Sequence, residues 1–303
     1  MESWNKIETV ERMQDYIREH EKDEPFNFAA LYAAAGYTRR HADRLFRELL
    51  GQTPREYLRA LRLSGSALRL LDKGKTVLEV ALDAQFESHE GYSRAFSSAF
   101  GVSPRQYRTG RHPIPLYVPA PVRHYYNYVY GKEPSAMDTL PLLCTVVPVA
   151  RPERRLMLLR SHKAADYWTF CEECCCDWEG LLNSLPDKFD TAAILTLPDF
   201  LTKDGYSRTA AGVELPLEYD GAVPDGYELV TLPPCEMLYF VGEPYENEEE
   251  FGRYIGGVLQ AVETYDPTRF GYAHADELAP RFNFGADPEK GARAAIPARR
   301  LDS

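Results

Sequence analysis

Several features that define large classes of protein are missing from this sequence. No run of about eighteen apolar residues occurs in the 303-residue chain, so no membrane-spanning helix is expected. The first residues carry acidic side chains and lack the apolar stretch of a secretory signal, which makes the cytoplasm the expected compartment. No GxSxG or HExxH motif and no complete set of metal ligands is present, so we expect neither an enzyme nor a bound cofactor or metal.

Spaced cysteines, which a secreted disulfide framework needs, are also missing. The chain has 6 cysteines, and four of them lie between Cys171 and Cys176. Cys171 and Cys174 have the spacing of two metal ligands, but no second such pair or nearby histidine completes a tetrahedral site. We therefore interpret the four as reduced thiols at the start of a helix, with a thiol-reactive or metal-sensing role as the alternative.

An excess of basic charge, which DNA-binding proteins usually carry, is missing from the chain as a whole, because the formal net charge is −11. The charge is unevenly divided, however. Residues 36–111 contain 14 Lys and Arg against 8 Asp and Glu, whereas the residues after 112 contain 17 against 30. Basic charge is thus concentrated in the first part of the chain. The acidic remainder is expected to repel the phosphates of DNA and not to contact DNA itself.

The basic region contains a repeat with a constant offset of fifty residues. The segment RLFRELLGQTPREY (44–57) returns as RAFSSAFGVSPRQY (94–107). Arginine, phenylalanine, glycine, proline-arginine and tyrosine recur at matching places. A match at a fixed period indicates one supersecondary unit that is used twice.

The apolar spacing predicts seven helices that form two helix-turn-helix motifs joined by a long helix. A glycine turn at Gly36 separates the helices of the first motif, and a turn at 85–87 separates those of the second. Thr76 and Glu79 form a capping box at the start of the second motif. The expected helices cover about 3–20, 28–35, 38–50, 54–71, 76–84, 88–100 and 104–108.

This region resembles the DNA-binding domain of the AraC/XylS family of transcriptional regulators. The motif that carries the resemblance runs from Phe86-Glu87-Ser88 through Tyr92-Ser93-Arg94-Ala95-Phe96 to Phe100-Gly101-Val102-Ser103-Pro104 and Tyr107-Arg108, and the segment from Gly36 to Phe46 agrees with it. The resemblance implies that the second helix of each motif enters the major groove, in adjacent segments on one face of the DNA.

The same resemblance implies two sets of contacts to duplex DNA. The candidates for base contacts are Arg40, Asp43, Arg44, His89, Glu90, Ser93 and Arg94. The candidates for phosphate contacts are Arg39, Arg47, Arg55, Lys73, Lys75, Arg105 and Arg108. A bidentate contact from Arg44 or Arg94 to guanine contributes about 1–3 kcal/mol of discrimination between bases.

Two residues depart from the family pattern. Gln85 stands before Phe86 where the family usually has glycine, and a left-handed backbone at that place costs roughly 1–2 kcal/mol. Tyr32 stands where the first motif usually has a small alanine. The first motif is therefore expected to pack or dock differently from the family pattern, and this difference affects the predicted base contacts of Arg40 and Asp43.

The rest of the chain predicts a second domain that mixes strands and helices. Residues 111–121 hold four prolines and predict a linker, and 122–141 predict an irregular connection. After residue 142, two strands, a helix and two strands are expected, and the same order then returns. The expected strands are 143–149, 155–160, 192–197, 209–217, 227–232, 237–241, 269–273, 281–284 and 292–297, and the expected helices are 165–185 and 248–265.

This second region resembles the gyrase-inhibitor-like small-molecule-binding domain. The resemblance lies in Ala165-Asp166-Tyr167, Cys176-Asp177-Trp178, Gly212 to Pro216, Pro224 to Tyr227, Gly242 to Tyr245 and Pro280-Arg281-Phe282. It implies a pocket lined by aromatic side chains for a small effector, which we expect to be aromatic. The candidate lining residues are Tyr167, Trp168, Tyr206, Glu214, Tyr239, Tyr245 and Phe282.

The family's pocket often holds an acid that follows a Pro-x-aromatic sequence, but Asn283 stands at that place here. Glu214 is the alternative source of negative charge, so a cationic effector is not predicted. Some relatives of the domain hydrolyse small electrophiles, and a hydrolase with a Trp-and-carboxylate pocket is the enzymatic alternative. It would need an acid where Asn283 stands.

The sequence thus predicts two domains, an all-α double helix-turn-helix domain followed by an α+β domain of two fused strand-strand-helix-strand-strand units. The expected boundaries are 1–110 for the first domain, 111–141 for the linker and connection, and 142–303 for the second domain. The predicted function is transcription regulation by sequence-specific DNA binding, controlled by a small molecule. Duplex DNA, the effector and RNA polymerase are the expected partners, and no membrane is expected to be involved.

Overall fold

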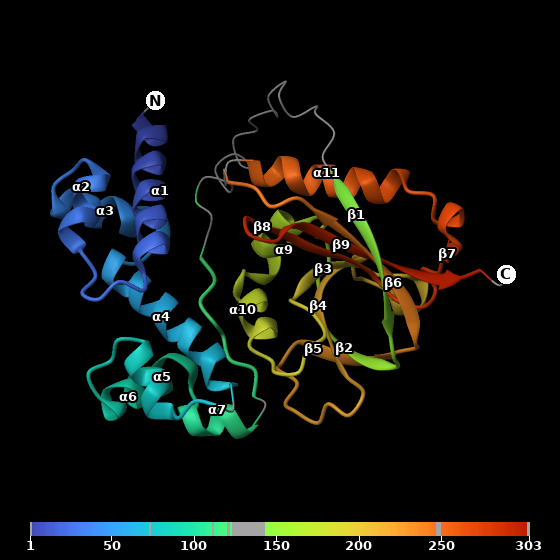
Figure 1. Cartoon of the computed structure of the whole chain (residues 1–303), viewed down its shortest axis with the longest axis horizontal. Coiled ribbons are helices and arrows are strands. Elements are labelled where there is room, and N and C mark those ends of the chain that lie inside the picture. Colours follow the sequence, from blue (N-terminus) through green and yellow to red (C-terminus); the bar gives the residue numbers. More distant parts are fainter. Residues whose placement is uncertain are drawn as a thin grey trace. The chain divides into compact units, whose positions relative to one another are not determined.

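The computed structural model of the protein describes residues 2–72, 74–110, 112–119, 122, 143–246 and 250–301 (Figure 1). The chain divides into two compact units, Met1–Lys132 and Glu133–Ser303. The first unit is helical and the second is built on a β-sheet, as predicted at this level of detail. None of the described helices is long and apolar enough to cross a lipid bilayer.

The helices of the first unit follow the predicted order. They are α1 Glu2–His20, α2 Phe28–Ala35, α3 Arg39–Leu50, α4 Pro54–Leu70, α5 Val77–Asp83, α6 His89–Phe100 and α7 Pro104–Gly110. Gly36, Gly51 and Gly101 end α2, α3 and α6 with φ values of 68°, 71° and 72°, in the left-handed region that favours glycine. The turn glycines therefore fix where three of the helices stop.

Side-chain caps fix where the helices of the first unit begin. The predicted capping box of Thr76 and Glu79 starts α5, and a second box of Thr53 and Glu56 starts α4. The side chain of Ser88 accepts a hydrogen bond from the Gly91 amide at 3.1 Å and starts α6. Thr38 occupies the predicted cap position of α3, but its side chain makes no capping hydrogen bond.

Two apolar cores support the two helix-turn-helix motifs. One core lies under α1 to α4 and includes Phe46, and the other lies under α4 to α7 and includes Phe96. Residues 112–119, which the sequence predicted as part of the linker, pack against both cores. Ile114 and Leu116 are buried in the second core, and the Tyr117 ring lies 5.5 Å from that of Tyr57 in the first. We call residues 112–119 the strap.

Among its described residues, the second unit has one sheet, three α-helices and two 3₁₀ turns. The strands are β1 Cys144–Arg151, β2 Arg154–Arg160, β3 Ala193–Thr196, β4 Thr209–Pro216, β5 Tyr227–Leu232, β6 Cys235–Gly242, β7 Tyr272–His274, β8 Arg281–Asp287 and β9 Gly291–Arg300. The helices are α9 Tyr167–Cys174, α10 Asp177–Asn183 and α11 Phe251–Thr264, and the turns are η2 Asp199–Leu201 and η4 Pro267–Phe270. The strand order is β1-β6-β9-β8-β3-β4-β2-β5, with β7 beside β9 and every pair antiparallel.

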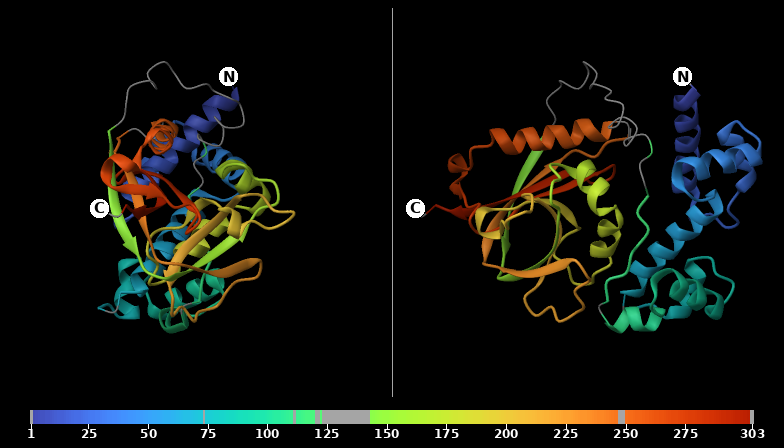
Figure 2. Two further views of the ribbon diagram at one scale, coloured as in Figure 1. Left: turned by 90° about the vertical axis from the view of Figure 1, so that its right-hand side faces the viewer. Right: turned by 180° about the vertical axis from the view of Figure 1, so that it is seen from behind.

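The two faces of this sheet have different cores, because successive side chains of a strand point to opposite faces. On β2, Leu156 and Leu158 belong to the inner core, whereas Met157 belongs to the core beneath α9 and α10. On β6, Met237 and Tyr239 point to the inner core, whereas the alternate side chains pack under α11. Figure 2 shows that the sheet curls and that α9, α10 and α11 lie on the outside of the curve.

Two predicted elements differ from the structure. The helix expected over 165–185 is broken into α9 and α10, because Cys175 has a positive φ of 61° and cannot continue a helix. The strand expected over 269–273 is replaced by the 3₁₀ turn η4 and the short strand β7, since Pro267 begins a turn and Gly271 ends it with a left-handed φ of 78°.

Candidate functional site

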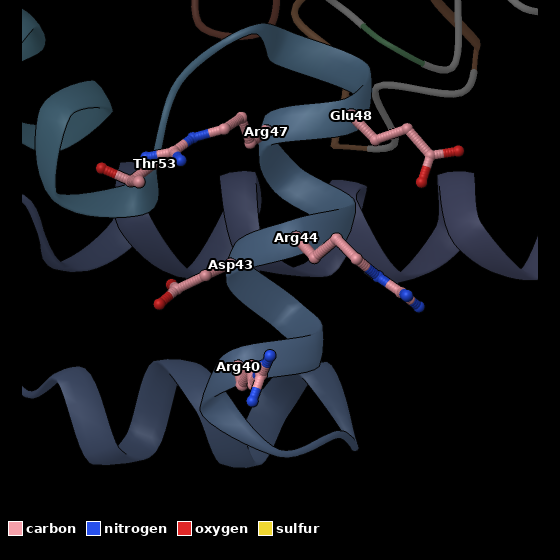
Figure 3. A pocket seen from close by; sticks show the side chains of 6 residues that line it. All are labelled: Arg40, Asp43, Arg44, Arg47, Glu48 and Thr53. Atoms are coloured by element: carbon pink, nitrogen blue, oxygen red, sulfur yellow. The ribbon is translucent and has the colours of Figure 1, made fainter.

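Helix α3 presents a basic outer face over an apolar inner face. Ala42, Leu45 and Phe46 are buried, whereas Arg40 and Arg44 are exposed. The exposed side lines an open hollow of about 540 Å³, which Figure 3 shows from close by. The hollow is bordered by Arg40, Asp43, Arg44, Arg47, Glu48 and Thr53. Three guanidinium groups therefore line one concave surface, which suits a polyanion.

Asp43 is engaged by two neighbouring side chains in this arrangement. The Tyr32 hydroxyl donates a hydrogen bond to Asp43 Oδ1 at 2.8 Å, and Arg39 Nε lies 3.7 Å from Asp43 Oδ2. Burial and this hydrogen bond raise the pKa of Tyr32, so the phenol stays protonated and keeps donating. The tyrosine that departs from the family pattern thus engages a predicted base-contact residue, and the base contact of Asp43 stays a prediction.

Helix α6 repeats the construction of α3 in the second motif. Tyr92, Ala95 and Phe96 form its buried face, whereas Arg94 is exposed. The predicted base-contact residues His89 and Glu90 are exposed in the first turn of α6, and Ser93 is half-buried. An exposed arginine therefore occupies the matching place on both helices.

The buried face of α6 is anchored by a polar contact as well as by packing. The hydroxyls of Tyr92 and Ser66 lie 3.0 Å apart in the core, and burial raises the pKa of Tyr92 to about 12. The phenol therefore stays neutral at any physiological pH, so this contact to α4 does not titrate. The exposed face of α6 is consequently held in one orientation.

The predicted phosphate contacts divide into three groups. Arg39, Arg47, Arg55 and Arg105 are exposed. Lys75 Nζ lies 2.7 Å from Asp83 Oδ2, in a surface ion pair that is weak enough for a phosphate to replace the carboxylate. Lys73 lies outside the described residues. The guanidinium of Arg108 donates to the carbonyl oxygens of Leu70 at 2.9 Å and Lys75 at 2.5 Å, and its phosphate contact stays a prediction.

The turn of the second motif contains a contact that the sequence did not predict. Gln85 has a left-handed φ of 61°, at the place where the family usually has glycine. Its side-chain Nε2 donates to the carbonyl oxygens of Lys22 at 3.0 Å and Asp23 at 2.9 Å, in the loop between α1 and α2. Arg62 of α4 donates to the same loop, at Glu21 O and Asp23 O. Gln85 therefore ties the second motif to the first.

Two substitutions at Gln85 separate backbone strain from these hydrogen bonds. Gln85→Ala keeps the left-handed strain and loses both bonds, which are worth about 0.5–1.5 kcal/mol each, so we expect a lower free energy of unfolding. Gln85→Gly loses the same bonds but relieves a strain of roughly 1–2 kcal/mol, and is expected to stay within about 1 kcal/mol of wild type. Denaturant unfolding of both variants measures the difference. Equal stability of the two variants would contradict the assignment of strain to Gln85.

The predicted effector-lining residues do not gather at one place. Glu214, Tyr239 and Phe282 are buried on the inner face of the sheet. Phe284, which the sequence did not single out, joins them there, with its ring 5.7 Å from those of Tyr239 and Phe282. These residues come from β4, β6 and β8, so the curl of the sheet brings them together.

The other four predicted lining residues lie elsewhere in the second unit. Tyr167 and Trp168 lie on α9, where their rings make an edge contact at 5.1 Å. Tyr206 stacks on His162 at 4.4 Å, and Tyr245 is buried against Tyr254 of α11 at 4.5 Å. The prediction of one aromatic pocket lined by all seven residues is therefore not reproduced by their placement.

Glu214 does not supply an uncompensated negative charge. Its carboxylate lies 3.1 Å from Arg151 Nε and 2.5 Å from Arg154 Nε, and the Arg154 side chain is fully buried. Arg154 also donates to Pro233 O at 2.8 Å. Glu214 is thus the acid of a buried ion cluster, and its contact with an effector stays a prediction. At the place where the family has its acid, Asn283 Oδ1 accepts from the Gly285 amide at 3.0 Å and shapes an irregularity in β8.

Within the described part of the chain, no three His, Cys, Asp or Glu side chains gather in a way that could hold a metal ion. The six cysteines are all free thiols there. The thiol-reactive or metal-sensing alternative for Cys171 to Cys176 stays a prediction.

Comparison with known proteins places the similarity on the helix-turn-helix motifs. A profile of a helix-turn-helix domain family matches residues 31–110. The Transposon Tn10 TetD protein of Escherichia coli is 38% identical over 93 residues, which are 31% of this chain and 67% of TetD. The Regulatory protein SoxS of Salmonella typhimurium is 30% identical over 99 residues, which are 33% of this chain and 92% of SoxS. Other matched relatives are longer, and the chain spans only 30% of their length.

A solved structure is similar over the same share of the chain. It is a transcriptional regulator of the AraC-type DNA-binding domain-containing proteins, from Chromobacterium violaceum. It is 26% identical, aligns with 32% of this chain and 88% of its own, and has a TM-score of 0.30.

Proposed function

Because the chain belongs to the AraC family of helix-turn-helix transcription regulators, we propose that its first unit binds duplex DNA through α3 and α6. Each helix lies in one of two successive major-groove segments. The observation that carries the proposal is the pair of exposed arginines, Arg44 and Arg94, at matching places on two helices of the same construction.

Base contacts and phosphate contacts have separate residues in this proposal. The residues proposed to contact base edges are Arg40, Arg44, His89, Glu90, Ser93 and Arg94. The residues proposed to contact phosphates are Arg39, Arg47, Arg55, Lys73, Lys75 and Arg105. Arg44 Nη2 lies 3.1 Å from His41 Nδ1, a contact that orients the guanidinium before it meets a base. Glu90 fits a cytosine N4 donor, or acts by repelling sequences that place a phosphate near it.

The proposal for the second unit is that it binds a small, aromatic effector and thereby controls how the first unit engages a promoter. The cluster of Tyr239, Phe282 and Phe284 supports an aromatic effector on the inner face. The two arginines that hold Glu214 argue against a cationic one. They also argue against the hydrolase alternative, which needs a free carboxylate. RNA polymerase is proposed as the protein partner on the basis of family membership.

Alanine substitution of the two arginines tests the DNA proposal. With the intact protein and duplex DNA from upstream of its own gene, Arg94→Ala and Arg44→Ala are each expected to weaken binding by about 1–3 kcal/mol, or roughly 5- to 150-fold, since each loses a bidentate contact. Gel shifts at a fixed moderate salt concentration measure the change. Sequence-independent binding by the wild-type protein would overturn the proposal.

Two controls make this test specific. Arg18→Ala removes an exposed arginine of α1 that pairs with Asp15 outside both motifs, and it is expected to leave the affinity unchanged. Arg105→Ala removes a phosphate contact, so it should weaken binding to all sequences alike and reduce the salt dependence by about one unit of slope. Equal effects of Arg94→Ala and Arg105→Ala on specificity would contradict the division into base and phosphate contacts.

A further inference from the structure

The inner face of the sheet in the second unit carries more positive than negative charge. Its three arginines are Arg151 on β1, Arg154 on β2 and Arg293 on β9, and the carboxylates that they contact are Glu214 and Asp190. Asp190 accepts from Arg293 Nη1 through both oxygens, at 3.0 and 2.9 Å, so these two side chains balance each other. Arg151 and Arg154 are left to share Glu214. The cluster therefore has one positive charge in excess among the described residues.

This excess charge can be reached at Arg151 rather than at Arg154. The Arg154 side chain is fully buried and donates to Glu214 and to Pro233 O. The Arg151 side chain is 9% exposed, and it donates to Glu214 through Nε and to the Tyr239 hydroxyl through Nη2 at 2.5 Å. Its Nη1 makes no hydrogen bond among the described residues. A guanidinium that has lost most of its water and keeps an unpaired donor is stabilised by an anion.

The phenol of Tyr239 does not supply the missing negative charge. Burial raises the pKa of Tyr239 by more than the neighbouring Arg151 lowers it, so the phenol stays protonated at physiological pH. Its hydroxyl therefore accepts from Arg151 as a neutral group. The positive charge in excess remains on the inner face.

Aromatic rings flank the arginines of the inner face. Arg151 Cζ lies 5.2 Å from the ring centre of Phe189 and 5.3 Å from that of Tyr239. The Phe284 ring stacks on Tyr239 with an angle of 12° between the ring planes, and Arg293 Cζ lies 4.9 Å from the centre of Phe284. Phe284 is half-buried and the Arg293 side chain is 20% exposed, so both keep contact with solvent. A flat apolar surface thus lies next to the positive charge.

We propose that the effector of the second unit is an aromatic anion, a planar ring that bears a carboxylate. This inference rests on the proposed function, in which the inner face receives a small aromatic molecule. The carboxylate accepts from Arg151 Nη1, and the ring packs against Phe284. Tyr239 contacts both of these side chains and so sets them side by side.

The charge of the cluster selects this class of effector over two others. A cationic aromatic molecule would add to the positive charge, and a neutral one would leave it in place. An anion compensates it and forms a charge-assisted hydrogen bond, which is stronger than a bond between neutral groups. A carboxylate also matches the planar guanidinium in shape.

Three probes that differ only in charge test the proposal on the full chain. They are naphthalenes that carry a carboxylate, a carboxamide or an amidine at the same ring position. In calorimetric titrations, we expect naphthoate to bind at least about tenfold more tightly than naphthamide, because its bond to Arg151 is charge-assisted. Naphthamidine is expected to bind most weakly. The order of these affinities in the wild-type protein tests the charge without any substitution.

Arg151→Gln tests which residue binds the carboxylate. The substitution removes the charge in excess and leaves Arg154 paired with Glu214, so the variant is expected to fold, which a melting curve establishes. Its preference for naphthoate over naphthamide should disappear, while the naphthamide affinity stays close to the wild-type value. Arg281→Gln is the matched control, since Arg281 pairs with Asp276 on the face of β8 opposite to Phe282, and it should keep the preference.

The possible failures are distinguishable. If naphthamide or naphthamidine binds as tightly as naphthoate, the anionic class is wrong and the small aromatic effector still stands. If none of the three probes binds, the proposed effector site fails together with this inference. A preference for naphthoate that survives in Arg151→Gln would overturn the assignment of the carboxylate to Arg151.

Discussion

Glu214→Ala is expected to destabilise the second unit by about 3–5 kcal/mol, because it leaves two buried guanidinium groups without their carboxylate. Arg154 is fully buried and Arg151 nearly so, and Glu214 bonds both through different oxygens. The Arg151 guanidinium is also enclosed by the rings of Phe189 and Tyr239, at 5.2 and 5.3 Å. Neither arginine can reach water without disturbing the inner core.

Denaturant unfolding followed by tryptophan fluorescence measures this effect, since Trp168 and Trp178 both lie in the second unit. The control is Glu153→Ala, which removes an exposed carboxylate from the turn between β1 and β2 and is expected to change the stability by less than about 0.5 kcal/mol. If Glu214→Ala unfolds at the same denaturant concentration as Glu153→Ala, the ion cluster does not stabilise the second unit.

Phe96→Ala is expected to destabilise the second helix-turn-helix motif by about 3–5 kcal/mol through the cavity that it leaves. Phe96 is fully buried, and its ring lies 4.7 Å from that of Phe100 and 5.9 Å from that of Tyr107. The contact with Tyr107 joins α6 to α7. The loss of these contacts releases the helix whose outer face carries Arg94, so DNA affinity should fall together with stability.

Circular dichroism during thermal unfolding measures the loss of helix in this variant. Leu82→Ala is the matched control, because Leu82 lies on α5 of the same motif but is 55% exposed. Phe46→Ala, the equivalent change in the first motif, should destabilise the other core to a similar degree. A Phe96→Ala protein with the stability of Leu82→Ala would mean that the second core does not depend on Phe96.

The features that were predictable from the sequence are those fixed by residues close together in the chain. A capping box, such as that of Thr76 and Glu79, and a glycine that ends a helix, such as Gly36 or Gly101, act over a few residues. The apolar residues of α3 and α6 likewise recur at the spacing of a helix. The helix-turn-helix motifs and the exposed Arg44 and Arg94 follow from them. The division into a helical unit and a sheet-containing unit follows in the same way.

The features that were not predictable depend on residues far apart in the chain. Gln85 meets Lys22 and Asp23, and Glu214 meets Arg151 and Arg154, across more than fifty residues in each case. Neither periodicity nor composition indicates such partners. The break at Cys175 was missed for another reason, since the apolar spacing continues through the turn and only the backbone angles mark it.

The strap has a consequence for where the first unit ends. A fragment cut at the end of α7, at Gly110, would leave behind Ile114 and Leu116, which fill the core beneath α6, and Tyr117, whose hydroxyl accepts from Gln52. Both motifs would then present an open apolar surface to water. The smallest autonomous form of the DNA-binding region therefore includes the eight residues 112–119, which lie beyond α7 and complete both cores.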